Sequence, residues 1–135
     1  MIAIDTSALI AIFRLEPEAD SFLKAIVRAQ ARIMSALSVL EASMVMSGGA
    51  KTASAFAPLD EFLAEAGIDI VPFDGPQALL ARAAFLRFGK GRHKAALNLG
   101  DCASYALAMA KGAPLLFKGE DFPLTDVRPA LAKGP

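Results

Sequence analysis

Short apolar runs alternate with longer amphipathic segments along this chain. The runs are rich in Ile, Leu and Val, which is typical of buried parallel strands. They predict strands at residues 1–4, 32–36, 68–73 and 113–119, and a short edge strand at 125–130. Between them, apolar residues recur at helical spacing. The predicted helices start after Asp5-Thr6-Ser7, cover residues 17–30, 39–45, 52–66 and 76–88, and start again at Asp101.

Capping residues support these boundaries. Asp, Thr and Ser at 5–7 are good helix N-caps, either Ser35 or Ser38 can cap the third helix, and Gly67 ends the fourth. The alternation predicts a single α/β domain over residues 1–135, an α/β/α sandwich with a mainly parallel sheet. Ligands of such sheets bind beyond the carboxyl ends of the strands.

Composition narrows the class of protein. Hydrophobic residues make up 55% of the chain and the mean hydropathy is +0.45, which is high for a monomer and indicates that a partner covers some apolar surface. Charges interrupt every apolar run before it reaches membrane-spanning length, and no secretion signal is visible, so we expect no membrane association. Cys102 is the single cysteine, which fits a reducing compartment, and we expect the protein in the cytoplasm.

The charge is balanced overall but unevenly distributed. Residues 1–74 hold ten acids and five bases, whereas residues 75–118 hold seven bases and Asp101 as the only acid. This asymmetry indicates an anionic partner for one face, although a solvated basic surface would give the same distribution of charge along the chain.

Four of the acids stand out because of their positions in the predicted elements. They lie after a buried strand, within an otherwise uncharged helix, at the start of an apolar helix, and beyond the last apolar strand: Asp5, Glu41, Asp101 and Asp121. Each has a simpler interpretation as a cap, turn or exposed residue. A parallel sheet would nevertheless bring all four to one edge.

Carboxylates pressed together repel one another, and a divalent cation relieves the repulsion. Mg²⁺ prefers oxygen ligands and keeps several waters, so one or two acids could bind it directly while the others hold its waters. Such a site suits cleavage of a phosphodiester by activated water.

Four segments, in this order and spacing, resemble the PIN-domain ribonucleases of the VapC toxin group: MIAIDTSALIAIF, LSVLEASMV, GKGRHKAALNLGDCASYALA and PLLFKGEDFPLTDV. The resemblance covers nearly the whole chain. It implies a PIN-like α/β/α sandwich and an endoribonuclease dependent on Mg²⁺ or Mn²⁺. It also implies inhibition by a VapB-type antitoxin, and a homodimer within a toxin–antitoxin hetero-oligomer.

The resemblance also assigns roles to individual residues. Asp5, Glu41 and Asp101 match the first three acids of the site, and Asp121 matches the fourth and least uniform one; all four are expected at the metal. Ser7 matches a hydroxyl that supports the first acid or a metal-bound water.

A basic loop leads towards Asp101. We expect its side chains to hold RNA phosphates, with help from a lysine beyond the last strand: Lys90, Arg92, His93, Lys94 and Lys118.

Two alternative functions remain open, and a third is disfavoured. A catalytically silent PIN-like interaction module and a housekeeping nuclease of RNA maturation both fit the sequence. A phosphate-hydrolysing α/β domain is disfavoured, because Asp5-Thr6-Ser7 lacks a second Asp and no glycine-rich phosphate loop follows the first strand.

Overall fold

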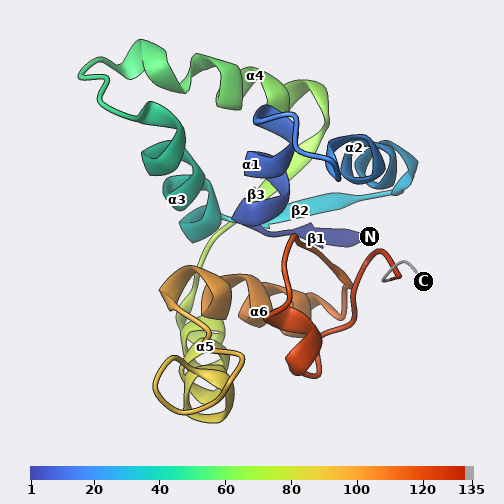
Figure 1. Cartoon of the computed structure of the whole chain (residues 1–135), viewed down its shortest axis with the longest axis vertical. Helices are drawn as coiled ribbons and strands as arrows, with labels where there is room; N and C mark the ends of the chain where they lie inside the picture. The colour runs from blue at the N-terminus through green and yellow to red at the C-terminus, as the bar shows by residue number, and fades with distance from the viewer. Residues whose placement is uncertain (133–135) are drawn as a thin grey trace.

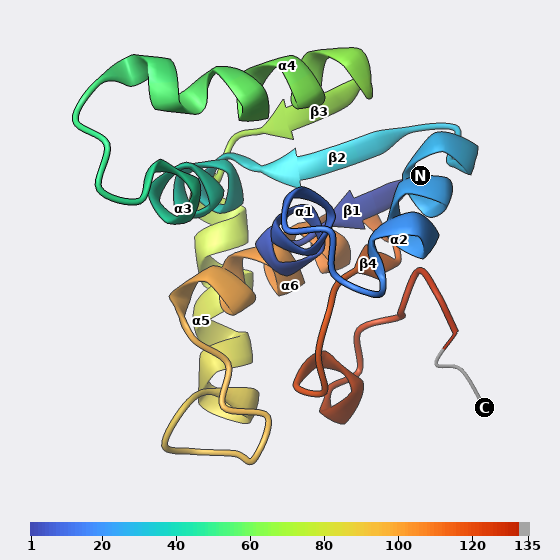
Figure 2. The ribbon, with the colours of Figure 1, turned by 45° about the horizontal axis from the view of Figure 1, so that its top comes forward.

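Four parallel strands form the centre of the protein, seen in a computed structural model that describes residues 1–132. They are β1 (Ile2–Ile4), β2 (Arg32–Ser35), β3 (Ile68–Val71) and β4 (Leu115–Leu116), paired in the order β3-β2-β1-β4. The arrowheads of β1, β2 and β3 point the same way in Figure 2, towards the end where α1 and α3 begin. The parallel arrangement therefore places the carboxyl ends of the strands at one edge.

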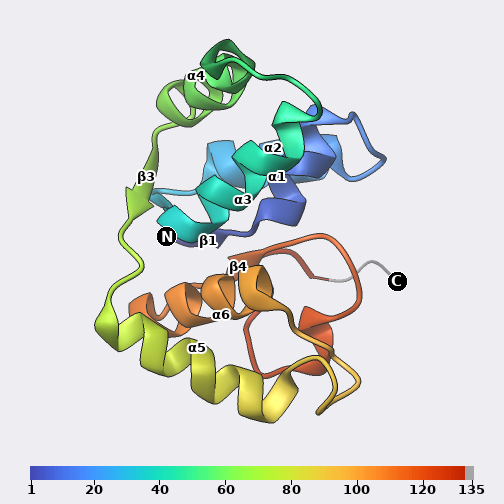
Figure 3. The ribbon, with the colours of Figure 1, turned by 90° about the vertical axis from the view of Figure 1, so that its left-hand side faces the viewer.

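Helices cover both faces of the sheet. One layer holds α1 (Thr6–Phe13), α2 (Ala19–Arg28), α3 (Ala36–Ser47) and α4 (Ala57–Glu65), and the other holds α5 (Gly75–Phe88) and α6 (Leu99–Lys111). Figures 1 and 3 show α5 and α6 together on the side of the strands away from α1–α4. Two short 3-10 turns complete the elements, η1 (Ala53–Phe56) and η2 (Phe122–Leu124). The predicted α/β/α sandwich is confirmed.

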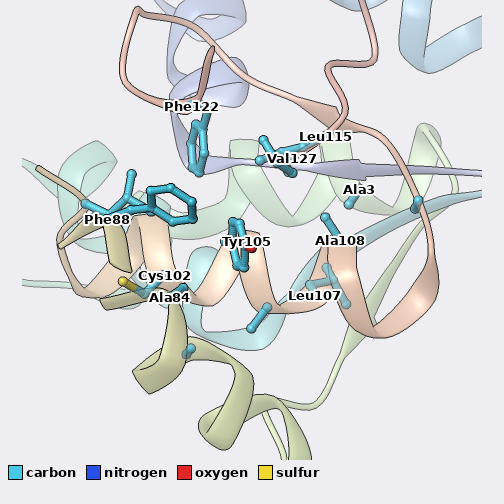
Figure 4. Close-up of a cluster of buried hydrophobic side chains, with 14 of the residues drawn as sticks. Ala3, Ala84, Phe88, Cys102, Tyr105, Leu107, Ala108, Leu115, Phe122 and Val127 are labelled. Atoms are coloured by element: carbon cyan, nitrogen blue, oxygen red, sulfur yellow. The ribbon is translucent and has the colours of Figure 1, made fainter. Parts of the chain in front are cut away.

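Strand alternation explains why there are two cores. Successive side chains of a strand point to opposite faces, so Ala3 packs with α5 and α6 while Ile4 packs with α1–α4. The pairs Ile33–Met34 and Leu115–Leu116 divide in the same way. Figure 4 shows the α6 side of this arrangement, where Tyr105, Phe88 and Phe122 lie close to the strands.

The C-terminal segment closes the β4 side of the sheet. The Leu115 N–H donates to the Arg128 carbonyl, and the Ala130 N–H donates to the Leu115 carbonyl, both at 2.8 Å. The edge strand predicted at 125–130 is therefore reduced to one bridge, between Leu115 and Pro129. Proline has no N–H to donate, which keeps the pairing from extending.

Other boundaries also differ from the prediction. The strand predicted at 113–119 is reduced to Leu115–Leu116, and the strand predicted at 68–73 ends at Val71. The segment 52–66 divides into η1 and α4, with a proline in the first turn of α4, where its missing N–H costs nothing. Helix α6 begins at Leu99 rather than at Asp101, because Asn98 is its N-cap. Within residues 1–132, none of the helices combines the length and apolarity that crossing a membrane requires.

Candidate active site

The four acids singled out in the sequence come from four different segments at the carboxyl edge of the sheet. Asp5 directly follows β1 and caps α1, and Glu41 lies in the second turn of α3. Asp101 lies in the first turn of α6, and Asp121 precedes η2 beyond β4. Burial first, and then the negative charges of the other three acids, raise the pKa of Asp101 to about 6, against the lowering effect of a hydrogen bond from the Asn98 backbone. The four carboxylates therefore share one electrostatic environment.

Asp5 is the most completely held of these acids. It is 3% exposed, and its Oδ2 accepts hydrogen bonds from the Ser7 N–H at 3.0 Å and the Ser7 hydroxyl at 2.6 Å. Its Oδ1 accepts from the Ser104 hydroxyl at 2.5 Å. Because α1 starts directly after β1, the N-cap role and the place at the strand end belong to the same carboxylate.

The hydroxyls that hold Asp5 are themselves held. The Lys118 N–H, just beyond β4, donates to Ser7 Oγ at 3.0 Å. Ser38 Oγ lies 3.1 Å from Ser104 Oγ, and both side chains are buried. Ser7 bonds to Asp5, which is one of the two contacts that the resemblance implied for it, and its part in catalysis stays a prediction. Ser38 and Ser104 were not predicted. The available signal was spacing, since Ser104 lies three residues after Asp101 on α6 and so shares its face.

Asp101, one of the four acids, also forms hydrogen bonds that fix the start of α6. Its N–H donates to Asn98 Oδ1 at 2.9 Å, and its Oδ2 accepts from the Asn98 N–H at 3.1 Å, which makes a reciprocal capping box. The cap fixes the start of α6 and the direction of the Asp101 side chain.

The Glu41 side chain reaches the start of α6 because residue 100 there is a glycine. A Cβ built on Gly100 would lie 2.4 Å from Glu41 Oε2 and 2.5 Å from Oε1, far inside van der Waals contact. Only a residue without a side chain lets the half-buried Glu41 carboxylate approach the first turn of α6.

The donor set fits a hard divalent cation. All four acids offer oxygen, which Mg²⁺ and Mn²⁺ prefer. The pKa of Asp101 is raised first by burial and then by the three neighbouring acids, so a bound cation would favour its ionised form. Within residues 1–132, no three His, Cys, Asp or Glu side chains lie close enough together to hold a metal ion jointly. The arrangement thus suits a cation bound through one or two carboxylates, with water as its other ligands.

The basic loop between α5 and α6 is shaped by its backbone and by aromatic packing. The Lys90 N–H donates to the Leu97 carbonyl at 3.0 Å, and the Leu97 N–H donates to the Phe88 carbonyl at 2.9 Å. The guanidinium of Arg92 lies 5.3 Å from the centre of the Phe85 ring. The charged groups of Lys90, Arg92 and Lys94 remain exposed on the loop that leads to Asp101.

Two other residues predicted to contact RNA are engaged within the protein. The ring of His93 packs edge-on against Phe88, and its Nδ1 accepts from the Ala95 N–H at 3.0 Å. The ammonium of Lys118 pairs with Glu16 and, at 3.1 Å, with Glu18. Both side chains have structural roles, and their contact with RNA stays a prediction.

Comparisons with known proteins agree with this arrangement. The family described as PIN domain matches residues 2–127. Ribonuclease VapC30 of Mycobacterium tuberculosis is 46% identical over 130 residues, which cover 92% of this chain and 94% of that protein. Ribonuclease VapC of Mycolicibacterium smegmatis is 48% identical over 130 residues, covering 92% of this chain and 95% of that protein.

Solved structures share the fold at lower identity. VapC20 of Mycobacterium tuberculosis, described as a Sarcin-Ricin loop cleaving toxin, has a TM-score of 0.71 and 16% identity, covering 96% of this chain and 100% of that one. VapBC2 from Rickettsia felis, bound to a DNA fragment from its promoter, has a TM-score of 0.73 and 17% identity, covering 96% of each chain. The family match and the relatives together show that this chain belongs to the VapC group of PIN-domain ribonucleases.

Proposed function

We propose that the chain hydrolyses RNA phosphodiester bonds at the four-acid site, as the toxin of a VapBC-type pair. The supporting observation is the convergence of Asp5, Glu41 and Asp121 on Asp101, whose pKa they raise together with burial. Asp5 and Asp101 would hold Mg²⁺, or Mn²⁺ in its place. Glu41 and Asp121 would orient water or a second ion.

The chain's own residues have separable tasks in this reaction. When bound, the cation supplies Lewis-acid chemistry, because it lowers the pKa of water and neutralises charge developing on the phosphate. Ser7 fixes the Asp5 carboxylate from the side of Oδ2. Glu41 would accept a proton from the attacking water as the water oxygen bonds to phosphorus. The bond from phosphorus to the leaving ribose oxygen breaks, and that oxygen takes up a proton from solvent.

The basic loop would hold the substrate. Lys90, Arg92 and Lys94 are exposed and precede the acid-bearing turn of α6, so they can neutralise phosphates on either side of the scissile bond. This contact depends on charge more than on orientation.

The antitoxin would bind beside the acids. A groove of about 410 Å³ between α3 and the start of α6 is lined mainly by apolar side chains and includes Glu41. Leu40, Met44 and Leu99 border it and are 58%, 67% and 75% exposed. An apolar antitoxin segment that places an arginine near Glu41 would cover this surface and compensate the acidic charge. The homodimer and the cytoplasmic location stay predictions.

The test is metal-dependent cleavage of RNA by the purified chain. Cleavage should require Mg²⁺ or Mn²⁺, stop on chelation, and fall roughly 10²- to 10³-fold in Asp5→Asn and in Asp101→Asn, since a catalytic cation contributes several kcal/mol. Asp60→Asn, an exposed acid on α4, is the matched control and should retain full activity.

Two outcomes would contradict the proposal. Full activity in either Asn variant would remove the metal role of that acid. Absence of metal-dependent cleavage of any RNA by a folded wild-type chain would favour the silent interaction module.

A further inference from the structure

Two serines outside the acidic set converge on Asp5 from the helices that cover opposite faces of the sheet. Ser38 lies in the first turn of α3, and Ser104 lies in the second turn of α6. Their side chains are 0% and 1% exposed, so neither contacts solvent. A buried hydroxyl needs a partner, and here the two hydroxyls partner each other and the acid.

The contacts determine which way each proton points. Asp5 Oδ1 is a carboxylate oxygen, so the Ser104 hydroxyl is the donor in that 2.5 Å hydrogen bond. The single hydroxyl proton of Ser104 is then committed, and Ser38 must be the donor in the 3.1 Å contact between the two serines. The order of donation is Ser38 to Ser104 to Asp5.

The position of Ser38 is fixed in turn. The Thr6 hydroxyl, next to Asp5 in the chain, donates to the Ser38 carbonyl at 3.0 Å and ties α3 to the start of α1. The hydroxyl chain therefore joins three helices at the residue that directly follows β1.

An inventory of lone pairs on Asp5 shows what this arrangement does. A carboxylate has about four acceptor positions, two on each oxygen. Ser7 occupies both positions on Oδ2 through its N–H and its hydroxyl, and Ser104 occupies one on Oδ1. Among the described residues, the hydrogen bonds to Asp5 thus leave one position, on Oδ1.

We infer that Ser104, with Ser38 behind it, is a positioning residue that presents Asp5 to the cation through a single oxygen in one orientation. This inference rests on the proposed function, because it needs a cation at Asp5. Groups that orient a metal ligand typically change metal affinity 10- to 100-fold when removed. Ser104 fits that role because, within residues 1–132, its hydroxyl donates to the proposed metal ligand Asp5 and to no other group.

The experiment measures Mn²⁺ affinity of the purified full-length chain by calorimetric titration, without RNA. Ser104→Ala should weaken Mn²⁺ binding about tenfold. Ser38→Ala should weaken it less, because Ser104 can still donate to Asp5 but loses the donor that fixes its proton. Ser43→Ala is the matched control, since Ser43 also lies on α3 and donates only to the Val39 carbonyl at 2.7 Å. Its affinity should equal that of the wild type.

The Asp5→Asn variant distinguishes failure of the positioning role from failure of the metal site itself. If Asp5→Asn loses Mn²⁺ binding while folded Ser104→Ala binds within twofold of wild type, the positioning role is wrong and the metal site stands. If Asp5→Asn binds Mn²⁺ as the wild type does, the cation is not at Asp5 and both claims fall. Thermal denaturation without metal verifies folding, and Ser38→Ala supplies the answer if Ser104→Ala does not fold.

Discussion

The acidic site and the basic loop that leads to Asp101 are built in opposite ways. The acids sit at a strand end and at helix starts, and Asp5 is buried and held by three hydrogen bonds. The basic loop has a fixed backbone, but its cationic groups extend into solvent. Hydrolysis requires reacting groups in one geometry, whereas holding a polyanion requires mainly positive charge. The contrast separates residues that set the rate from residues that set substrate affinity.

The variant Gly100→Ala tests the geometry of the acidic site most sharply. The new methyl group would occupy the place of the Glu41 carboxylate, which is the mobile end of a long side chain and can move away. We expect RNA cleavage to fall about 10- to 100-fold, as for a misplaced catalytic group. The melting temperature should stay equal or rise, because Ala favours a helix over Gly by up to about 1 kcal/mol.

A double variant shows whether the effect passes through Glu41. In a Glu41→Ala background the methyl group has no carboxylate to displace, so Gly100→Ala should cause little further loss of cleavage. Equal losses in both backgrounds would mean that Gly100 acts in another way.

The role of the basic loop is tested by a double variant in which Arg92 and Lys94 are both replaced by Ala. RNA affinity, measured with EDTA present to prevent cleavage, should fall about tenfold at low salt. The slope of log affinity against log salt should become shallower by about 1.4, or 0.7 for each lost phosphate contact on a single strand. The matched control replaces Lys24 and Arg28, which are exposed on α2, and should leave the slope unchanged.

An unchanged salt slope in the Arg92 and Lys94 variant would assign substrate binding to another surface. A slope that changes while the rate at saturating RNA does not would confirm the division between affinity and geometry.

The smallest expected effect concerns stability and electrostatic repulsion. The pKa of Asp101 is raised from 3.8 to about 6 by burial first and then by the other acids. Folding therefore favours the protonated form, and this stabilisation is present below pH 4 and lost as the pH rises through about 6. Asp101→Asn removes the charge and keeps an oxygen for the Asn98 N–H.

In EDTA at pH 8, we expect Asp101→Asn to raise the free energy of unfolding by about 1 kcal/mol, reduced from the full shift because the side chain is half-buried. The difference should vanish near pH 4, and chemical denaturation between pH 4 and 8 would measure it. A wild type more stable than Asp101→Asn at pH 8 in EDTA would show that neither burial nor the neighbouring acids destabilise the ionised Asp101 carboxylate.

Sequence patterns predicted the sandwich because strand runs and helical spacing depend on neighbouring residues. The junction acids were also visible, since a parallel sheet places every strand end at one edge. The hydrogen bonds from Ser104 to Asp5 and between Ser38 and Ser104 could not be predicted. These residues are far apart in the sequence and meet only in the folded chain, and serine is common in helices. The helix predicted to start at Asp101 leaves Gly100 outside it. Its contact with Glu41 links residues 59 positions apart, which no local pattern shows.

The two outer strands of the sheet also differ in how they deter unwanted pairing. The outer side of β4 is occupied by Arg128 and Ala130, which bond to Leu115. At the opposite margin, β3 carries the exposed Asp69 near its middle. A strand from another chain would meet an occupied backbone on one margin and an unfavourable charge on the other. Association with other proteins is thereby directed away from β-sheet extension, and with it from amyloid-like aggregation, and towards the helical surfaces.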